Sequence, residues 1–209
     1  MSLCNCEIPA SLSAIVGNKQ RIGQITRLYF QRTRTAGVDN KFTVATEDPT
    51  LLATWVAAAA LTTSAKVIQS PILDEFTPTG GGVIEYTGNT ANGIPKPLGE
   101  EPHTWTFELL DGDQVTTAAA LKALQCEPTA TDGLSLFAVN DCGNVIGKST
   151  DDYVTFMPIP IEALSVLGVD KFGRTTPGSN MIKITLKPDW ADYLKIIAPA
   201  DFNAQTVIF

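Results

Sequence analysis

The sequence predicts an α+β protein: a mainly antiparallel β-sandwich or barrel with two or three flanking helices and long loops. Two observations support this class. Segments in which apolar and polar residues alternate recur along the chain, which is typical of half-buried strands. Helical patterns are few and do not follow strands regularly, so the chain lacks the βαβ repeat of a parallel sheet. With 209 residues, 44% of them hydrophobic and 18% charged, the chain can bury a large core, and we expect one domain over residues 1–209.

The expected strands are rich in β-branched and aromatic residues. They are 24–35, 66–70, 83–86, 103–111, 136–139 with 145–146, the start of 152–167, and 182–188. In the strand at 103–111, Trp105, Phe107 and Leu109 should share one face. Pro158 and Pro160 interrupt residues 152–167, so we expect this part at a sheet edge or in an extended arm.

Three segments have helical patterns: 46–64, 113–127 and a short one at 189–199. In the first, Asp48 is suited to the N-cap and Pro49 to the first helical position. The apolar residues of that helix repeat at spacings of three and four, as expected of a face packed on the core; they are Leu52, Trp55, Val56, Ala59 and Ala60. Asp189 is suited to cap the short helix.

Residues 71–102 have an unusual composition, with five prolines and six glycines. Only "VIEY" within them has a strand pattern, and such a long irregular segment is normally functional or disordered. We therefore expect an extended Pro/Gly-rich loop or arm at about 71–102, and we expect it to contact a neighbouring subunit. The triple glycine at 80–82 lacks the Gly-Lys-Ser/Thr that a phosphate-binding loop needs, which favours a flexible or hinge stretch.

A tight hairpin is predicted by "LFAVNDCGNVIGK", residues 136–148. Asn, Asp and Gly tolerate the positive φ angles of hairpin turns, and Gly143 is the expected positive-φ position. The turn also contains Cys142, which could be a nucleophile, a metal ligand, half of a disulfide or a small packed residue. We expect a structural, unreactive thiol, because no local signature of a catalytic cysteine surrounds it and a disulfide is uncommon in a cytoplasmic protein.

Other residues with reactive or metal-binding side chains form no recognisable motif. Cys4 and Cys6 are spaced more closely than the paired ligands of structural zinc, and His103 is the only histidine. Adjacent carboxylates converge poorly on a cation, so solvated loop charge is the better interpretation of each such pair; the pairs are Asp74 with Glu75, Glu100 with Glu101, and Asp151 with Asp152. We expect no catalytic residue, no cofactor and no metal site.

The net charge of −7 is unevenly distributed. Residues 1–45 contain six basic and two acidic side chains, so the remaining residues are strongly acidic. Such a chain can meet copies of itself head to tail, although the same asymmetry also fits an ordinary solvated surface. Overall acidity argues against a nucleic-acid reader. We also expect no signal peptide and no contact with a membrane, because the first residues lack a basic region and no apolar run is long enough to span a bilayer.

Residues 105–205 resemble virion structural proteins of tailed phages that infect Bacteroidetes. The resemblance lies in "TAAALKALQCEP", "LSLFAVNDCGNVIGK" and "DYVTFMPIPIEALSVL", followed by "MIKITLKPDWADYLKIIAPADFNA". It covers about half the chain and rests on the order of the elements and on their residue composition. Within the group the chain most resembles tail-tube proteins, which are similar to the tube proteins of type VI secretion systems.

The resemblance implies a structural, non-enzymatic role in the virion tail. Tail-tube proteins form hexameric rings that stack into a tube, and phage DNA passes through the lumen without specific binding. The expected partners are copies of this chain and other tail or neck proteins, and assembly would occur in the host cytoplasm. Residues 71–102 exceed a minimal tube fold, which leaves head-completion, decoration and tail-terminator roles open.

Two further classes follow from single residues. One is an enzyme that uses Cys142 or His103. The other is a host-binding module that binds carbohydrate through a tryptophan, although the spacing of Trp55, Trp105 and Trp190 favours core positions for all three.

Overall fold

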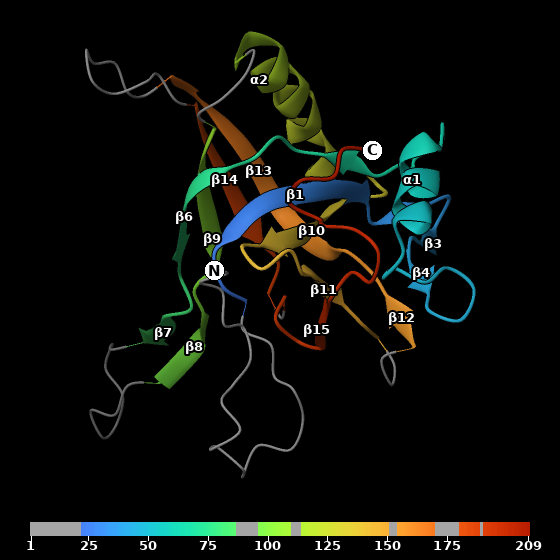
Figure 1. Cartoon of the computed structure of the whole chain (residues 1–209). Helices are drawn as coiled ribbons and strands as arrows, with labels where there is room; N and C mark the ends of the chain where they lie inside the picture. Colours follow the sequence, from blue (N-terminus) through green and yellow to red (C-terminus); the bar gives the residue numbers. More distant parts are fainter. Residues whose placement is uncertain (1–21, 87–95, 110–113, 151–153, 170–179, 189) are drawn as a thin grey trace, which may run out of the picture.

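The protein is described by a computed structural model (Figure 1), which covers residues 22–86, 96–109, 114–150, 154–169, 180–188 and 190–209. Most strands belong to one nine-stranded sheet. Its strands are β1 (Ile25–Arg32), β5 (Ile68–Gln69), β6 (Asp74–Thr79), β9 (Thr104–Leu109), β10 (Leu134–Asn140), β11 (Val145–Lys148), β13 (Ile159–Val169), β14 (Asn180–Leu186) and β15 (Leu194–Ile197).

Shorter elements surround this sheet. Three two-stranded sheets pair β2 (Arg34–Thr35) with β3 (Val38–Asp39), β4 (Phe42–Thr43) with β12 (Thr155–Phe156), and β7 (Val83–Tyr86) with β8 (Lys96–Glu100). The helices are α1 (Leu52–Ala60) and α2 (Gln114–Ala123), and α2 continues into a 3₁₀ helix at Leu124–Thr129. Figure 1 shows α1 and α2 at well-separated positions around the sheet.

The large sheet branches at β10. On one side, β10 pairs antiparallel with β1 along nearly its whole length. On its other side, Ser135 and Leu136 pair with β13, whereas Ala138 and Val139 pair with β11. One branch continues from β11 to β15 and the other from β13 through β14 and β9 to β6. All described pairings are antiparallel and the large sheet does not close on itself within the described residues, which confirms the α+β class with an open sheet in place of a barrel.

Two hydrophobic clusters meet at β1, where neighbouring residues point to opposite faces. Phe30 belongs to the main core, which includes Trp105, Phe107 and Leu109 of β9 on the shared face expected from the sequence. Tyr29 belongs to the second core. The second core consists of Tyr29, Phe42, Trp55, Ala58, Val67, Phe137, Val139, Val145, Phe156, Ile197 and Ala204.

Helix α1 is shorter than the predicted helix and is capped differently. Asp48 accepts hydrogen bonds from the backbone N–H and the hydroxyl of Thr50 (2.9 and 2.8 Å), in a turn before the helix. The Leu52 N–H instead donates to Oδ1 of Asp201 (2.8 Å), so a distant residue satisfies a free donor of the first turn. The buried face also differs from the prediction, because Trp55 and Ala58 are buried whereas Val56 is exposed.

The Pro/Gly-rich segment has more structure than the sequence predicts. Besides β7, which is the expected "VIEY" strand, it contains β6 and β8. Strand β6 pairs with β9 despite Pro78 and a register shift between Asp74 and Thr77. Proline and irregular pairing are tolerated there because β6 ends the sheet and bonds a strand on one side only.

Two predictions for the second half of the chain are wrong. Pro160 lies in β13, which is flanked by β10 and β14 and is therefore an interior strand. Pro160 is tolerated because it lies at the start of the strand, where β13 passes from one neighbour to the other. The segment expected as a helix at 189–199 contains turns and β15 within its described residues, 190–199, since Leu194 to Ile197 pair with β11. The proposed cap, Asp189, lies outside the described residues.

The C-terminal residues pack against their own chain. Ala204 is fully buried, and the ring of Phe209 lies 5.1 Å from that of Tyr29 and 6.3 Å from that of Trp55. The second core therefore includes contacts from residues more than 170 positions apart.

Candidate functional site

The predicted hairpin between β10 and β11 is confirmed. Oδ1 of Asn140 accepts hydrogen bonds from the N–H groups of Cys142 and Asn144 (3.1 and 2.9 Å). The Gly143 N–H donates to the Asn140 carbonyl oxygen (2.9 Å), and Gly143 has a φ of 78°. The turn thus depends on one side-chain amide and one glycine, as its composition indicates.

Cys142 is disulfide-bonded, which corrects the expectation of a free thiol. That expectation was based on the rarity of disulfides in the cytoplasm. Whether a disulfide can form also depends on whether the fold brings a second cysteine sulfur within reach. The partner cysteine lies outside the described residues, as do both Cys4 and Cys6. Cys126 is free and exposed. A sulfur held in a disulfide is not available as a thiolate nucleophile.

The other candidate residues are dispersed over the molecule. The ring of His103 contacts that of Trp190 at 5.4 Å, and Trp190 contacts Trp105 at 5.2 Å. All three tryptophans are buried, as expected, and none presents a face on which a sugar could stack. Among the described residues no three His, Cys, Asp or Glu side chains lie close enough to hold a metal ion. Asp151 and Asp152 lie outside the described residues.

The second core is held closed by hydrogen bonds to the C-terminal residues. The Tyr29 hydroxyl donates to the carbonyl oxygen of Ala204 (2.6 Å). The carbonyl oxygen of Val207 accepts from Nη1 of Arg27 and from Nε2 of Gln69, both at 2.7 Å. Burial raises the pKa of Tyr29 to about 12, and burial also lowers the pKa of Arg27.

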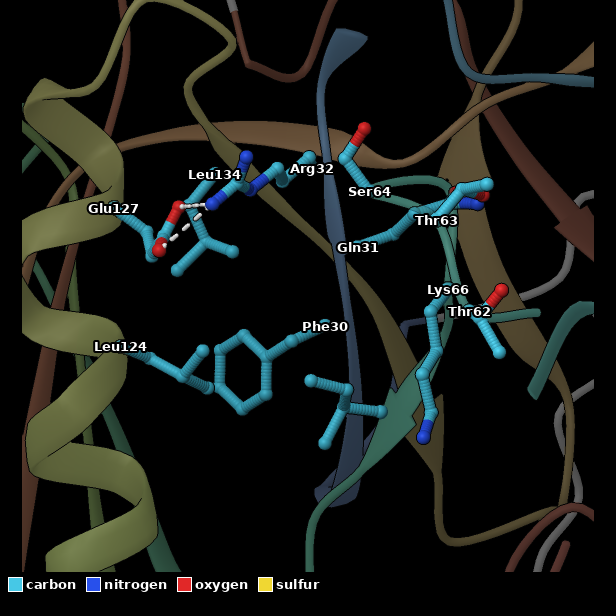
Figure 2. Close-up of a pocket in the computed structure, with 11 residues that line it drawn as sticks. Phe30, Gln31, Arg32, Thr62, Thr63, Ser64, Lys66, Leu124, Glu127 and Leu134 are labelled. Carbon is cyan, nitrogen blue, oxygen red and sulfur yellow. Dashed lines mark hydrogen bonds and ion pairs between the residues drawn. The ribbon is translucent and has the colours of Figure 1, made fainter. Parts of the chain in front are cut away.

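The main core is less completely covered at its edge beside β1, where a pocket of about 330 Å³ opens (Figure 2). Figure 2 shows the ring of Phe30 facing Leu124 across the pocket, with Leu134 above them. Eleven residues line it: Phe30, Gln31, Arg32, Thr62, Thr63, Ser64, Lys66, Ile68, Leu124, Glu127 and Leu134.

The rim of this pocket is polar and mostly cationic. Nη2 of Arg32 lies 2.8 Å from Oε2 of Glu127, and Nη1 of Arg32 lies 3.8 Å from Asp132. On the opposite side of the pocket in Figure 2 lies Lys66, which forms no ion pair with any described residue. The pocket can therefore accept an apolar group that has a negative charge beside it.

The amino-acid sequence does not predict this pocket. Its walls come from β1, from the segment before β5 and from the 3₁₀ helix, which are separated by tens of residues. The only local signal was the change of β1 from apolar to basic residues at Arg32. Pairing of β1 with β5 brings Ile68 opposite Phe30, and that register cannot be derived from either segment alone.

Comparisons with known proteins provide little to add to this geometry. No protein-family model matches the chain, and no curated protein sequence matches it. A search of solved structures returns a chain of a "Virion of native gene transfer agent (GTA) particle", with 9% sequence identity and a TM-score of 0.28. The match covers 59% of this chain and 82% of that chain. None of the helices within the described residues has the length and apolar character needed to cross a membrane.

Proposed function

We propose that this chain is a structural protein of a tailed-phage virion and that it assembles with copies of itself into stacked, sixfold rings of the tail tube. The proposal is supported by the resemblance of residues 105–205 to tail-tube proteins. Residues that carry the resemblance form the hairpin and the strands β13 and β14, which are central to the sheet. The role is non-enzymatic, and phage DNA would pass through the lumen without specific binding.

The observation that most favours self-assembly is the number of large apolar side chains on the surface. Among the described strands, β5, β6 and β15 are each paired on one side only, and such edges favour association with another chain. Exposed large hydrophobic residues occur on strands, on α1 and in loops: Val38, Val44, Leu51, Val56, Leu61, Ile68, Ile72, Val154, Leu167, Tyr193 and Ile208.

Electron microscopy tests the proposal directly. The purified chain is imaged over a range of concentrations and salt, and an antibody against it is applied to purified virions or particles. We expect sixfold rings or tubes, and labelling along the tail. A protein that stays monomeric throughout and is absent from particles would contradict the proposal. Labelling of the head or neck alone would instead indicate a head-completion, decoration or terminator role.

The hairpin of β7 and β8 provides a second test, because it can be removed cleanly. These two strands pair only with each other in the structure. The Glu101 N–H donates to the carbonyl oxygen of Gly82 (2.7 Å), so Gly82 and Glu101 are already adjacent. Joining residue 82 directly to residue 101 should yield a folded chain that no longer polymerises into tubes. Normal assembly of this variant would show that the hairpin does not contribute to subunit contacts.

A further inference from the structure

The segment 66–74 forms an extended edge beside β1. Gln69 and Ile68 pair with Tyr29 and Phe30. Further along, the N–H of Ser70 donates to the carbonyl oxygen of Leu28 and the N–H of Leu73 to that of Thr26, both at 2.8 Å. On its other side, β5 bonds no strand among those described. The Val67 N–H donates to the carbonyl oxygen of Ala58 in α1 (3.2 Å), so α1 covers the outer edge at that residue, whereas the side chains of Ile68 and Ile72 stay exposed.

The exposed side chains of this segment have a symmetrical order. Ile68 and Ile72 are 44% and 58% exposed. Lys66 precedes them and Asp74 follows them, and both are exposed. The order is therefore Lys, Ile, Ile, Asp. Read from the other end, the order is again charged, isoleucine, isoleucine, charged, but each charge has the opposite sign.

This order is complementary to a second copy of itself. If two such segments lie antiparallel, Lys66 of each copy comes opposite Asp74 of the other, and Ile68 comes opposite Ile72. Opposite charges and apolar side chains that face each other across such a contact are complementary. A contact in which each copy contributes the same residues is the two-fold arrangement of most protein dimers.

The surroundings of the segment favour both contacts. Ile68 and Lys66 lie on the rim of the pocket described above, whose floor is apolar, so the Ile72 side chain of a second copy can enter it. Lys66 has no ion pair with a described residue. Asp74 is exposed, so its carboxylate is accessible to a cation of a second copy.

We propose that two copies of this chain associate about a two-fold axis through their 66–74 segments, with Ile72 of each in the pocket of the other and with paired Lys66 and Asp74. Pro71 lacks an N–H and interrupts backbone pairing at the centre, so side chains carry the contact. The inference rests on the proposed function in taking the partner to be a second copy. A two-fold contact stops at a dimer, so it is additional to any contact that builds rings.

Charge reversal tests this dimer in the full-length chain. After tubes are removed by centrifugation, sedimentation equilibrium measures the association of the soluble fraction. Lys66→Asp or Asp74→Lys places like charges together twice in each dimer, and we expect the dissociation constant to rise about tenfold or more. The double variant Lys66→Asp/Asp74→Lys restores the pairs and should recover the parent's affinity.

A matched control changes the same charges elsewhere. Lys187 and Asp192 are exposed and distant in sequence from the segment, so Lys187→Asp/Asp192→Lys should dimerise like the parent. Circular dichroism confirms that each variant is folded. A parent that remains monomeric, single variants that dimerise normally, or a double variant that stays monomeric would each overturn the proposal. Dimers without any tubes would contradict the tail-tube role alone, and tubes with a monomeric soluble fraction would contradict this contact alone.

Discussion

The two sides of β1 differ in how the chain covers them. On the Tyr29 side, residues from the C-terminal end complete the second core, and hydrogen bonds to Ala204 and Val207 hold them in place. On the Phe30 side, none of the described segments covers the edge of the main core in this way, and a pocket of about 330 Å³ remains. The first side is closed within one chain, whereas the second is suited to a group from outside it. Of two adjacent residues in β1, Tyr29 can thus contribute to the stability of the single chain, and Phe30 to association with another molecule.

Removing residues 203–209 should have the largest effect on this comparison. It would expose the Tyr29 and Trp55 rings and leave the Arg27 guanidinium buried without its acceptor at Val207. Loss of the partly buried Phe209 ring and of five hydrogen bonds to the rest of the chain should lower the free energy of unfolding by about 4 kcal/mol or more, measured by urea denaturation. Ile208→Ser is the control, because that side chain is 83% exposed and should have little effect. A truncated chain as stable as the parent would show that the second core is complete without its tail.

Tyr29 should make stability depend on pH above about pH 10. Burial raises its pKa from 10.0 to about 12, so between these values the unfolded chain releases a proton that the folded chain keeps. Stability is therefore fully present below pH 10 and falls as the pH rises to 12, by roughly 2–3 kcal/mol. Tyr29→Phe should remove this slope, at a cost of about 1 kcal/mol at neutral pH from the lost hydrogen bond.

Tyr193→Phe is the matched control for this measurement, because Tyr193 is largely exposed. It should leave the pH dependence of unfolding unchanged between pH 10 and 12. An equal slope in the parent and in Tyr29→Phe would show that another group causes the alkaline loss, and that the second core does not protect the Tyr29 hydroxyl.

The two cores should also respond differently to a tryptophan-to-phenylalanine change. Nε1 of Trp55, in the second core, donates to the carbonyl oxygen of Pro49 (2.8 Å). The buried Nε1 of Trp190, in the main core, has no hydrogen-bond partner among the described residues. Trp55→Phe should therefore cost about 2–3 kcal/mol. Trp190→Phe removes an unsatisfied donor and should cost at least about 1 kcal/mol less. Equal losses in thermal or urea unfolding would contradict the difference.

The sequence predicted an element correctly where contacts between residues close in sequence determine its structure. The strands at 24–35, 103–111 and 182–188 were found because alternation within each segment marks a half-buried strand. The hairpin was found because Asn140 and Gly143 determine their own turn. The fold class followed from these elements, since strands without a βαβ repeat favour antiparallel pairing.

The errors arose where a distant segment decides the outcome. Residues 194–197 form a strand because β11 pairs with them, although their own pattern suggested a helix. Asp201, rather than Asp48, accepts a hydrogen bond from the first turn of α1, although it lies 149 residues from the donor, Leu52. The disulfide of Cys142 and the pocket beside Phe30 likewise depend on segments that only the folded chain brings together.

The smallest expected effect concerns the ion pair at the pocket rim. The side chains of Arg32 and Glu127 are 38% and 25% exposed, so solvent screens their attraction. Glu127→Gln keeps the shape of the side chain and should cost no more than about 1 kcal/mol of unfolding free energy, less at high salt. Asp39→Asn removes the partner of Arg34 in a more exposed pair and is the control, with an expected change near zero. A loss at Glu127 well above 2 kcal/mol, insensitive to salt, would mean that this pair holds the Phe30 side of β1 closed as firmly as the C-terminal residues hold the Tyr29 side.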